Sequence, residues 1–254
     1  MDTYRWRTID IVIASIIAVA FGVIFWAWNL VWSATEGAFA FFPPAHTLLY
    51  GIWLMPAVLS GLIIRKPGAS LYTETLAAVL SALLGDQWGA TVIVQGLIQG
   101  LGAELAFAAL RYRSYRLPAA LLAGALTGVG AALFDFFVWN AAYALWSYRV
   151  PYALLTVVSS MVIAGVGSWA LVRALAPTGV LDRFPAGRDR ALVGRERGRP
   201  PRVRVAARRP PGLGGPRDRP ADRARRAGAA PGPVRSRQEH RAGGARRAAA
   251  GGFR

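Results

Sequence analysis

The feature that most constrains this chain is a series of long apolar runs, followed near residue 190 by a stretch of Arg, Ala, Gly and Pro. Residues 194–254 contain 18 arginines, no lysine and 4 acidic residues, which is a net +14 of the whole chain's +17. The preceding residues carry 12 basic and 9 acidic side chains, a net of only +3. The two parts therefore need separate interpretations, and the total charge does not by itself indicate a nucleic-acid-binding protein.

The apolar runs are long enough to cross a membrane as helices, which takes about 20 residues each. The chain is 54% hydrophobic with a mean hydropathy of +0.35, too apolar for an ordinary soluble domain. The third run is short and contains Glu74, so we expect it to depend on neighbouring helices for cover. The predicted fold is an all-α membrane protein, a bundle of six transmembrane helices. The expected spans are residues 8–31, 46–64, 71–84, 89–110, 117–142 and 151–176.

The charges between these spans predict how the protein lies in the membrane. One side would hold Glu36, Asp86 and a single basic residue, Arg149. The other side would hold eleven basic residues, and Lys and Arg are enriched in cytoplasmic loops, so both termini are expected in the cytoplasm. The first apolar run is long enough to span, so we expect no cleaved signal peptide and a multi-pass protein of the plasma membrane. The eleven are Arg5, Arg7, Arg65, Lys66, Arg111, Arg113, Arg116, Arg173, Arg183, Arg188 and Arg190.

Residues 191–254 form a tail with no hydrophobic periodicity, after a membrane domain of residues 1–190. One interpretation is a disordered polybasic tail that contacts anionic lipid. Arg without Lys, beside Ala, Gly and Pro, is also typical of GC-rich DNA translated out of frame. After a shift of one base, codons for residues 232–242 can read GPSGAGKSTAL, a phosphate-binding loop of the form GxxxxGK[ST]. The second interpretation is therefore the out-of-frame start of a downstream ATPase gene.

Polar side chains inside the predicted spans mark candidate functional positions, because such groups are costly in a membrane. Near the cytoplasmic side, pairing of Asp10 with Arg7 and of Glu74 with Arg65 is the simpler explanation. Further out, amides, carboxylates and aromatic rings occur at similar depths, with pairs four residues apart on one helix face. The candidate substrate-binding residues are Tyr50, Trp53, Gln95, Gln99, Glu104, Asp135 and Trp139.

A pocket of amides, carboxylates and aromatic faces suits a small, flat, nitrogen-rich cation. Hydrogen bonding between helices is the alternative for these residues, and for Gln95 the two interpretations are equal. The aromatic residues at the outer ends of the first and fifth spans, among them Trp32 and Tyr148, also fit a belt of interfacial anchors.

Several classes of function are disfavoured. The chain has no cysteine and two histidines, which leaves no disulfide or thiolate metal site and little for a His-based metal centre. No paired-carboxylate or Ser/His constellation supports catalysis, and no phosphate-binding loop occurs in the frame as translated. We therefore expect a protein that is not an enzyme and has neither cofactor nor resident metal.

The first span carries a stripe of small residues, Ala14, Ala18 and Gly22, spaced four apart. Small residues let another helix approach closely, so the stripe is either packing within the bundle or a docking face for a partner membrane protein.

Several short segments together resemble the YkoE-type substrate-binding (S) component of energy-coupling factor (ECF) transporters, over residues 5–183. They are the small-residue first helix, YGIW (50–53), IRKPGA (64–69) with Glu74, QGLGAE (99–104), Leu117-Pro118, Asp135 and TGVL (178–181). The resemblance implies a six-helix subunit that captures thiamine or its hydroxymethylpyrimidine part from outside. It also implies that a transmembrane coupling subunit and ATPase subunits drive its reorientation, with the Ala14, Ala18 and Gly22 stripe as docking surface. The long Arg-rich tail departs from the family.

Three alternatives remain at this point. The ligand could be another vitamin or organic cation. The protein could instead be a membrane-anchored protein that binds anionic lipid or nucleic acid through its basic tail. It could also be a scaffold without ligand. We favour a vitamin-capturing transport subunit in the lipid bilayer, with no nucleic acid as partner.

Overall fold

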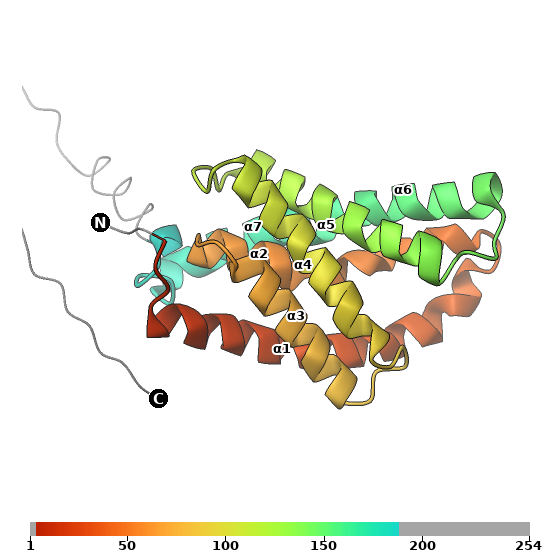
Figure 1. Ribbon diagram of the computed structural model, residues 1–254, viewed down its shortest axis with the longest axis horizontal. Coiled ribbons are helices and arrows are strands. Elements are labelled where there is room, and N and C mark those ends of the chain that lie inside the picture. Colours follow the sequence, from red (N-terminus) through yellow and green to blue (C-terminus); the bar gives the residue numbers. More distant parts are fainter. Residues whose placement is uncertain (1–3, 188–254) are drawn as a thin grey trace, which may run out of the picture. The chain divides into compact units, whose positions relative to one another are not determined.

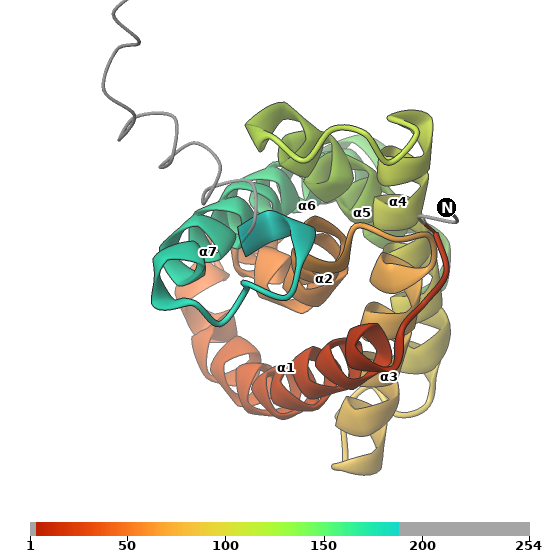
Figure 2. The same cartoon turned by 90° about the vertical axis from the view of Figure 1, so that its left-hand side faces the viewer.

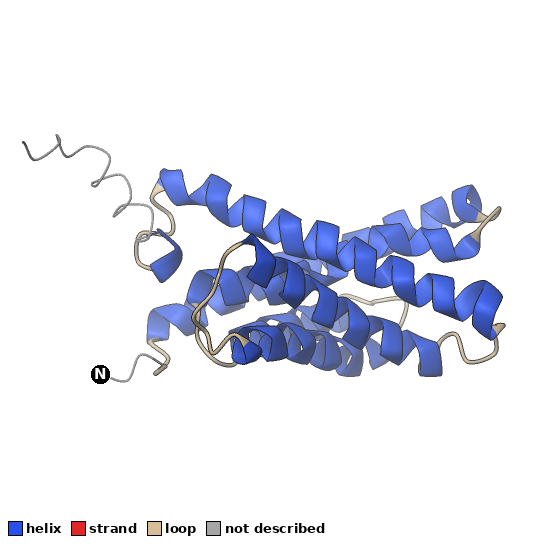
Figure 3. Ribbon diagram, turned by 90° about the horizontal axis from the view of Figure 1, so that it is seen from above, coloured by secondary structure: helices blue, strands red, loops and turns tan. Residues whose placement is uncertain are grey.

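Helices are the only regular elements among residues 4–187, the part of the chain that the computed structural model describes (Figures 1 and 3). The prediction of an all-α fold is therefore confirmed. Five helical stretches are long and apolar enough to cross a membrane, and α3 (Ala69–Leu83) is a shorter apolar helix. Both interpretations of the tail at 191–254 lie outside the described residues.

The helices follow the predicted spans in order, with two departures from regular α-helix. The first crossing is α1 (Thr8–Thr35), and the third to fifth are α3, α4 (Thr91–Ala109) and α5 (Leu117–Val138). The second crossing joins a 3₁₀ helix to an α-helix, and the sixth contains π-helical turns. The second consists of Pro43–Leu54 (3₁₀) and α2 (Met55–Ile64); the sixth consists of Leu145–Arg149 (π), α6 (Val150–Ser159), Ser160–Gly167 (π) and α7 (Ser168–Leu175).

α1 and α6 run roughly along the long axis of Figure 1, whereas α3 and α4 cross it obliquely, and α2 lies in the middle of the bundle when it is viewed end-on (Figure 2). The surroundings of α2 agree with this position, because every residue from Pro56 to Ile64 is buried. We call the end with the loops at 65–68 and 110–116 the closed end, and the end with the loops at 84–90 and 139–144 the cavity end. The assignment of the closed end to the cytoplasm stays a prediction.

A buried ion pair joins the start of α1 to the loop at 65–68 at the closed end. The Asp10 side chain is 0% exposed, and its carboxylate accepts hydrogen bonds from Arg7 Nη2 at 2.9 Å and Lys66 Nζ at 2.5 Å. Lys66 also donates to the Arg5 carbonyl, and the Trp6 indole donates to the Pro67 carbonyl. The predicted Asp10–Arg7 pair is therefore confirmed, and Lys66 is an additional partner.

The segment after α7 folds back against the same end. Leu181 and Phe184 are 3% and 2% exposed, and they belong to an apolar cluster with Ala14 and Ile64. A left-handed residue, Gly179 at φ +80°, allows the chain to turn after the last helix. These residues are therefore part of the core of the bundle.

The small-residue stripe of α1 faces the interior. Ala14 and Ala18 are 0% exposed, and a Cβ at Gly22 would lie 2.7 Å from Leu80 Cβ of α3. The three residues therefore pack within the bundle, and their role as a docking face for a partner subunit stays a prediction. The opposite face of α1 carries exposed aliphatic side chains such as Val19, which suits contact with lipid.

Candidate functional site

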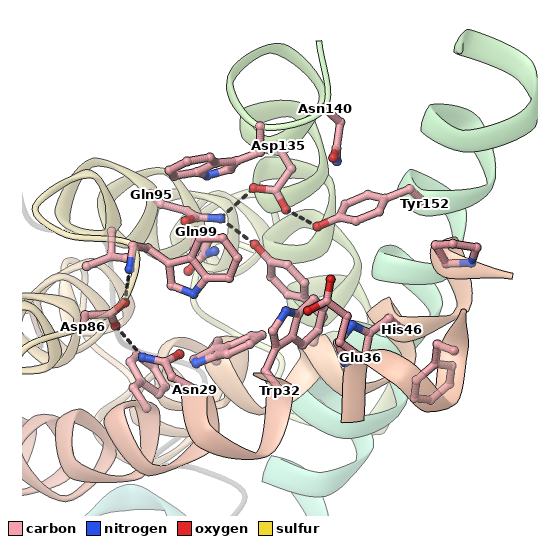
Figure 4. A pocket seen from close by; sticks show the side chains of 18 of the residues that line it. Asn29, Trp32, Glu36, His46, Asp86, Gln95, Gln99, Asp135, Asn140 and Tyr152 are labelled. Carbon is pink, nitrogen blue, oxygen red and sulfur yellow. Dashed lines mark hydrogen bonds between the residues drawn. The ribbon is translucent and has the colours of Figure 1, made fainter. Parts of the chain in front are cut away.

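A cavity of about 550 Å³ lies at the cavity end, between α1, the second crossing, α4, α5 and α6 (Figure 4). Six of the seven predicted substrate-binding residues line it, although they come from three separate crossings. The six are Tyr50, Trp53, Gln95, Gln99, Asp135 and Trp139. The structure therefore brings these predicted residues together, and their contact with a ligand stays a proposal.

Asp135 is the centre of a polar network on one wall of the cavity (Figure 4). The Gln95 amide donates to Asp135 Oδ1 at 2.8 Å and to the Tyr50 hydroxyl at 2.5 Å. The Tyr152 hydroxyl donates to Asp135 Oδ2 at 2.8 Å. Asp135 is 1% exposed, and its partners are all neutral side chains. Gln95 thus forms the expected hydrogen bonds between helices and also lines the cavity, and its contact with a ligand stays a proposal.

Aromatic rings from two crossings form a second wall. The Trp32 ring stacks on His46 at a centroid distance of 3.7 Å, and it lies 5.0 Å from Trp53. Tyr50 meets Trp53 edge-to-face at 5.3 Å, and Phe39 stacks on His46 at a centroid distance of 5.0 Å. Such a wall offers flat faces to a planar ligand, and stacked or edge-to-face contacts with it are favourable.

A second polar network, centred on the carboxylate of Asp86, borders the cavity near the loop after α3. Asp86 Oδ2 accepts hydrogen bonds from Asn29 Nδ2 at 2.8 Å and Ser81 Oγ at 2.5 Å, and Asp86 Oδ1 accepts one from the Trp88 backbone at 2.9 Å. The Oδ1 atom of Asn29 and the Nδ2 atom of Asn140 are buried and have no hydrogen-bond partner within residues 4–187. This part of the wall therefore still has hydrogen-bonding capacity.

The cavity has an acidic lining. Glu36, Asp86 and Asp135 border it, and no Lys or Arg does so within the described part of the chain. The nearby Arg149 instead lies over the Phe136 ring, 3.6 Å from its centroid, and donates to the Phe136 carbonyl. Carboxylates facing aromatic rings attract a cation that also has a flat face.

Glu104, the seventh predicted residue, lies away from this cavity at the closed end. Its carboxylate accepts hydrogen bonds from the backbone of Gly68 at 2.7 Å and Ser70 at 3.1 Å, and from the Tyr112 hydroxyl at 2.6 Å. Its carboxylate binds the start of α3, where free N–H groups need acceptors. Burial and this carboxylate raise the pKa of Tyr112. A ligand-binding role for Glu104 is therefore not supported by its position.

Most residues that line the cavity were not among the predicted site residues, including Trp32, His46, Asp86 and Tyr152. Trp32 was assigned to the interfacial belt, and Asp86 was treated only as a loop charge. His46 and Tyr152 carried no signal, because their neighbours in the cavity come from other crossings. The 3₁₀ geometry of Pro43–Leu54 places Tyr50 and Trp53, three residues apart, on one face of the helix.

Comparisons with known proteins agree with this arrangement. Residues 9–130 match the family described as "ABC-type cobalt transport system, permease component". Among the described residues no group of three or more His, Cys, Asp or Glu side chains could hold a metal ion. The chain is 37% identical over 186 residues to the "Putative HMP/thiamine permease protein YkoE" of Bacillus subtilis (strain 168), covering 72% of this chain and 92% of that protein.

A solved structure is also similar to this chain. The "Crystal structure of an S-component of ECF transporter" superposes with a TM-score of 0.71 at 36% identity, covering 76% of this chain and 96% of that one. The apolar helices and these relatives identify a multi-pass protein of the plasma membrane, in a class that is not enzymatic. The chain therefore belongs to the YkoE family, whose members are substrate-binding S-components of ECF transporters.

Proposed function

We propose that this protein captures thiamine, or its hydroxymethylpyrimidine moiety, for an ATP-driven importer. The observation that carries the proposal is the cavity itself, which has aromatic walls, three bordering carboxylates and no Lys or Arg among its described lining residues. The name of the Bacillus subtilis relative, which specifies HMP and thiamine, supports the same ligand class.

The cavity chemistry matches both halves of thiamine. Its aminopyrimidine ring is flat and carries hydrogen-bond donors and acceptors, which suit the amides of Gln99 and Asn140. Its thiazolium ring is a cation, which suits Asp135 and the aromatic wall around Trp53. The volume of about 550 Å³ also lies within the usual range of small-molecule sites.

The energy for uptake would come from other subunits. The chain contains no GxxxxGK[ST] segment in its own frame, so we propose that separate ATPase subunits and a transmembrane coupling subunit drive release of the substrate. This assignment follows from membership of the S-component family.

Calorimetry on the purified protein tests the ligand. We expect saturable binding of thiamine and of hydroxymethylpyrimidine, and no binding of Co²⁺, which controls for the cobalt family described above. The isolated thiazole half of thiamine is the second control, because it lacks the pyrimidine ring to which the amides of the cavity would hydrogen-bond. If neither thiamine nor hydroxymethylpyrimidine binds, the proposed ligand class is wrong.

A further inference from the structure

The second crossing is broken where it passes the cavity. Residues Pro43–Leu54 form a 3₁₀ helix, and α2 begins at Met55. Pro56 has no N–H group, so the hydrogen-bond ladder is interrupted at this point. A 3₁₀ stretch of this length is unusual and often marks a functional position. In a membrane, the backbone groups released by such a break need partners from neighbouring helices.

Side chains from three other helices supply those partners. Glu74 Oε2 of α3 accepts the Ala57 N–H at 2.8 Å. The Ser168 hydroxyl of α7 donates to the Met55 carbonyl at 3.2 Å. The Ser159 hydroxyl of α6 donates to the Leu48 carbonyl at 2.8 Å and accepts the Gly51 N–H at 3.0 Å. The break is therefore held on both sides by specific hydrogen bonds.

Glu74 is unusual among these partners. It is 0% exposed, and its second oxygen has no hydrogen-bond partner within the described residues. The sequence suggested pairing with Arg65, and the structure shows that this expectation is wrong, because the carboxyl group reaches the α2 backbone instead. A buried carboxyl group is costly, and this cost offsets the stabilisation from its hydrogen bond with the Ala57 N–H. Stability alone therefore does not explain its presence.

The position of the hydrogen bond suggests what it does. Ala57 follows Trp53 by one helical turn, and both Trp53 and Tyr50 belong to the cavity wall. We propose that Glu74 is a positioning residue for substrate binding, which holds the break in the second crossing and so fixes the Tyr50 and Trp53 side chains toward the cavity. This inference rests on the proposed function of the cavity.

Three variants test the inference. Glu74→Gln keeps an oxygen acceptor for the Ala57 N–H, and we expect its thiamine affinity to stay within about twofold of the unchanged protein. Glu74→Met has similar length without that acceptor, and we expect about tenfold weaker binding. Thr73→Val is the matched control, since Thr73 is the neighbouring residue, is equally buried and has no hydrogen-bond partner within residues 4–187. Its affinity should not change.

Two further measurements separate positioning from stability. The thermal midpoint of Glu74→Met should not fall, whereas its affinity should, and a purely structural residue would not show this combination. Hydrogen–deuterium exchange over residues 50–58 should be faster in Glu74→Met than in Glu74→Gln. Unchanged affinity in Glu74→Met, or an equal loss in Thr73→Val, would overturn the inference. If the unchanged protein binds neither thiamine nor hydroxymethylpyrimidine, the proposed function is wrong. The exchange measurement needs no ligand, so unchanged exchange in Glu74→Met would overturn the positioning role independently.

Discussion

Buried carboxylates at the two ends of the bundle have different kinds of partner. At the closed end, Asp10 is bound by Arg7 and Lys66, and Glu104 accepts two backbone N–H groups and a tyrosine hydroxyl. At the cavity end, Asp135 accepts hydrogen bonds from the neutral side chains of Gln95 and Tyr152. At the closed end Asp10 therefore has its counter-charge in Arg7 and Lys66, whereas no Lys or Arg among the described residues lines the cavity around Asp135.

This difference distinguishes carboxylates that stabilise the fold from a carboxylate that we propose binds a ligand. A buried ion pair is strongly destabilised when one partner is removed, so the closed end connects the loops firmly. A buried carboxylate with neutral partners is costly until a cation arrives, and a cationic ligand then removes part of that cost. The comparison predicts that changes at one end affect stability and that changes at the other end affect affinity.

The largest effect is expected from Lys66→Met. Lys66 is buried against Asp10, whose side chain is 0% exposed, so the variant leaves that carboxylate with Arg7 alone. We expect the free energy of unfolding to fall by about 3 kcal/mol, measured by denaturant titration in detergent. The double variant Asp10→Asn/Lys66→Met should recover most of the loss, because no charge is left unpaired. Equal stability of Lys66→Met and the unchanged protein would contradict a structural role of the pair.

The next effect concerns affinity at the cavity end. Asp135→Asn keeps the shape of the side chain and removes its charge, so we expect thiamine to bind about 30-fold more weakly, or about 2 kcal/mol. Hydroxymethylpyrimidine, which is neutral, should lose less. Glu104→Gln is the matched control at the closed end, and calorimetry should show its affinity unchanged. A larger loss in Glu104→Gln than in Asp135→Asn would reverse the comparison.

The smallest effect is a dependence of stability on alkaline pH at the closed end. Burial, together with Glu104, raises the pKa of Tyr112, and burial also raises the pKa of Tyr115. A tyrosine with a raised pKa in the folded state stabilises the fold below its ordinary pKa of about 10 and loses that contribution as the pH rises further. Unfolding measured between pH 8 and 11 should show a shallower decline for Tyr112→Phe. An unchanged decline would leave Tyr115 as the main contributor.

The sequence predicts the helical crossings well, because long apolar runs with few charges have few other solutions. It also identifies Asp135 and Gln99 as candidate site residues, since a polar residue in an apolar run is conspicuous. It does not reveal the break in the second crossing, because Pro56 fits an ordinary first helical turn and the partner of Ala57 lies on another helix.

Errors in the site have a common physical origin. Trp32 has the composition of an interfacial anchor, and only the fold turns its ring toward His46. Glu104 and Asp135 look alike in sequence, as single carboxylates in apolar helices, but one meets a loop backbone and the other a cavity. Depth along a helix can be read from residue number, whereas the direction that a side chain faces depends on which helices are neighbours.

The residues after the last helix have a practical consequence for work with shortened versions of the protein. Leu181 and Phe184 are core side chains, and a Cβ at Gly187 would lie 2.4 Å from the Leu181 carbonyl, so this stretch is as much part of the folding unit as any crossing. A stop codon or fusion partner placed directly after α7 would expose the closed end. A stop codon placed after Arg190 would instead spare all of these contacts, so uptake by that shortened protein measures what the arginine-rich residues contribute.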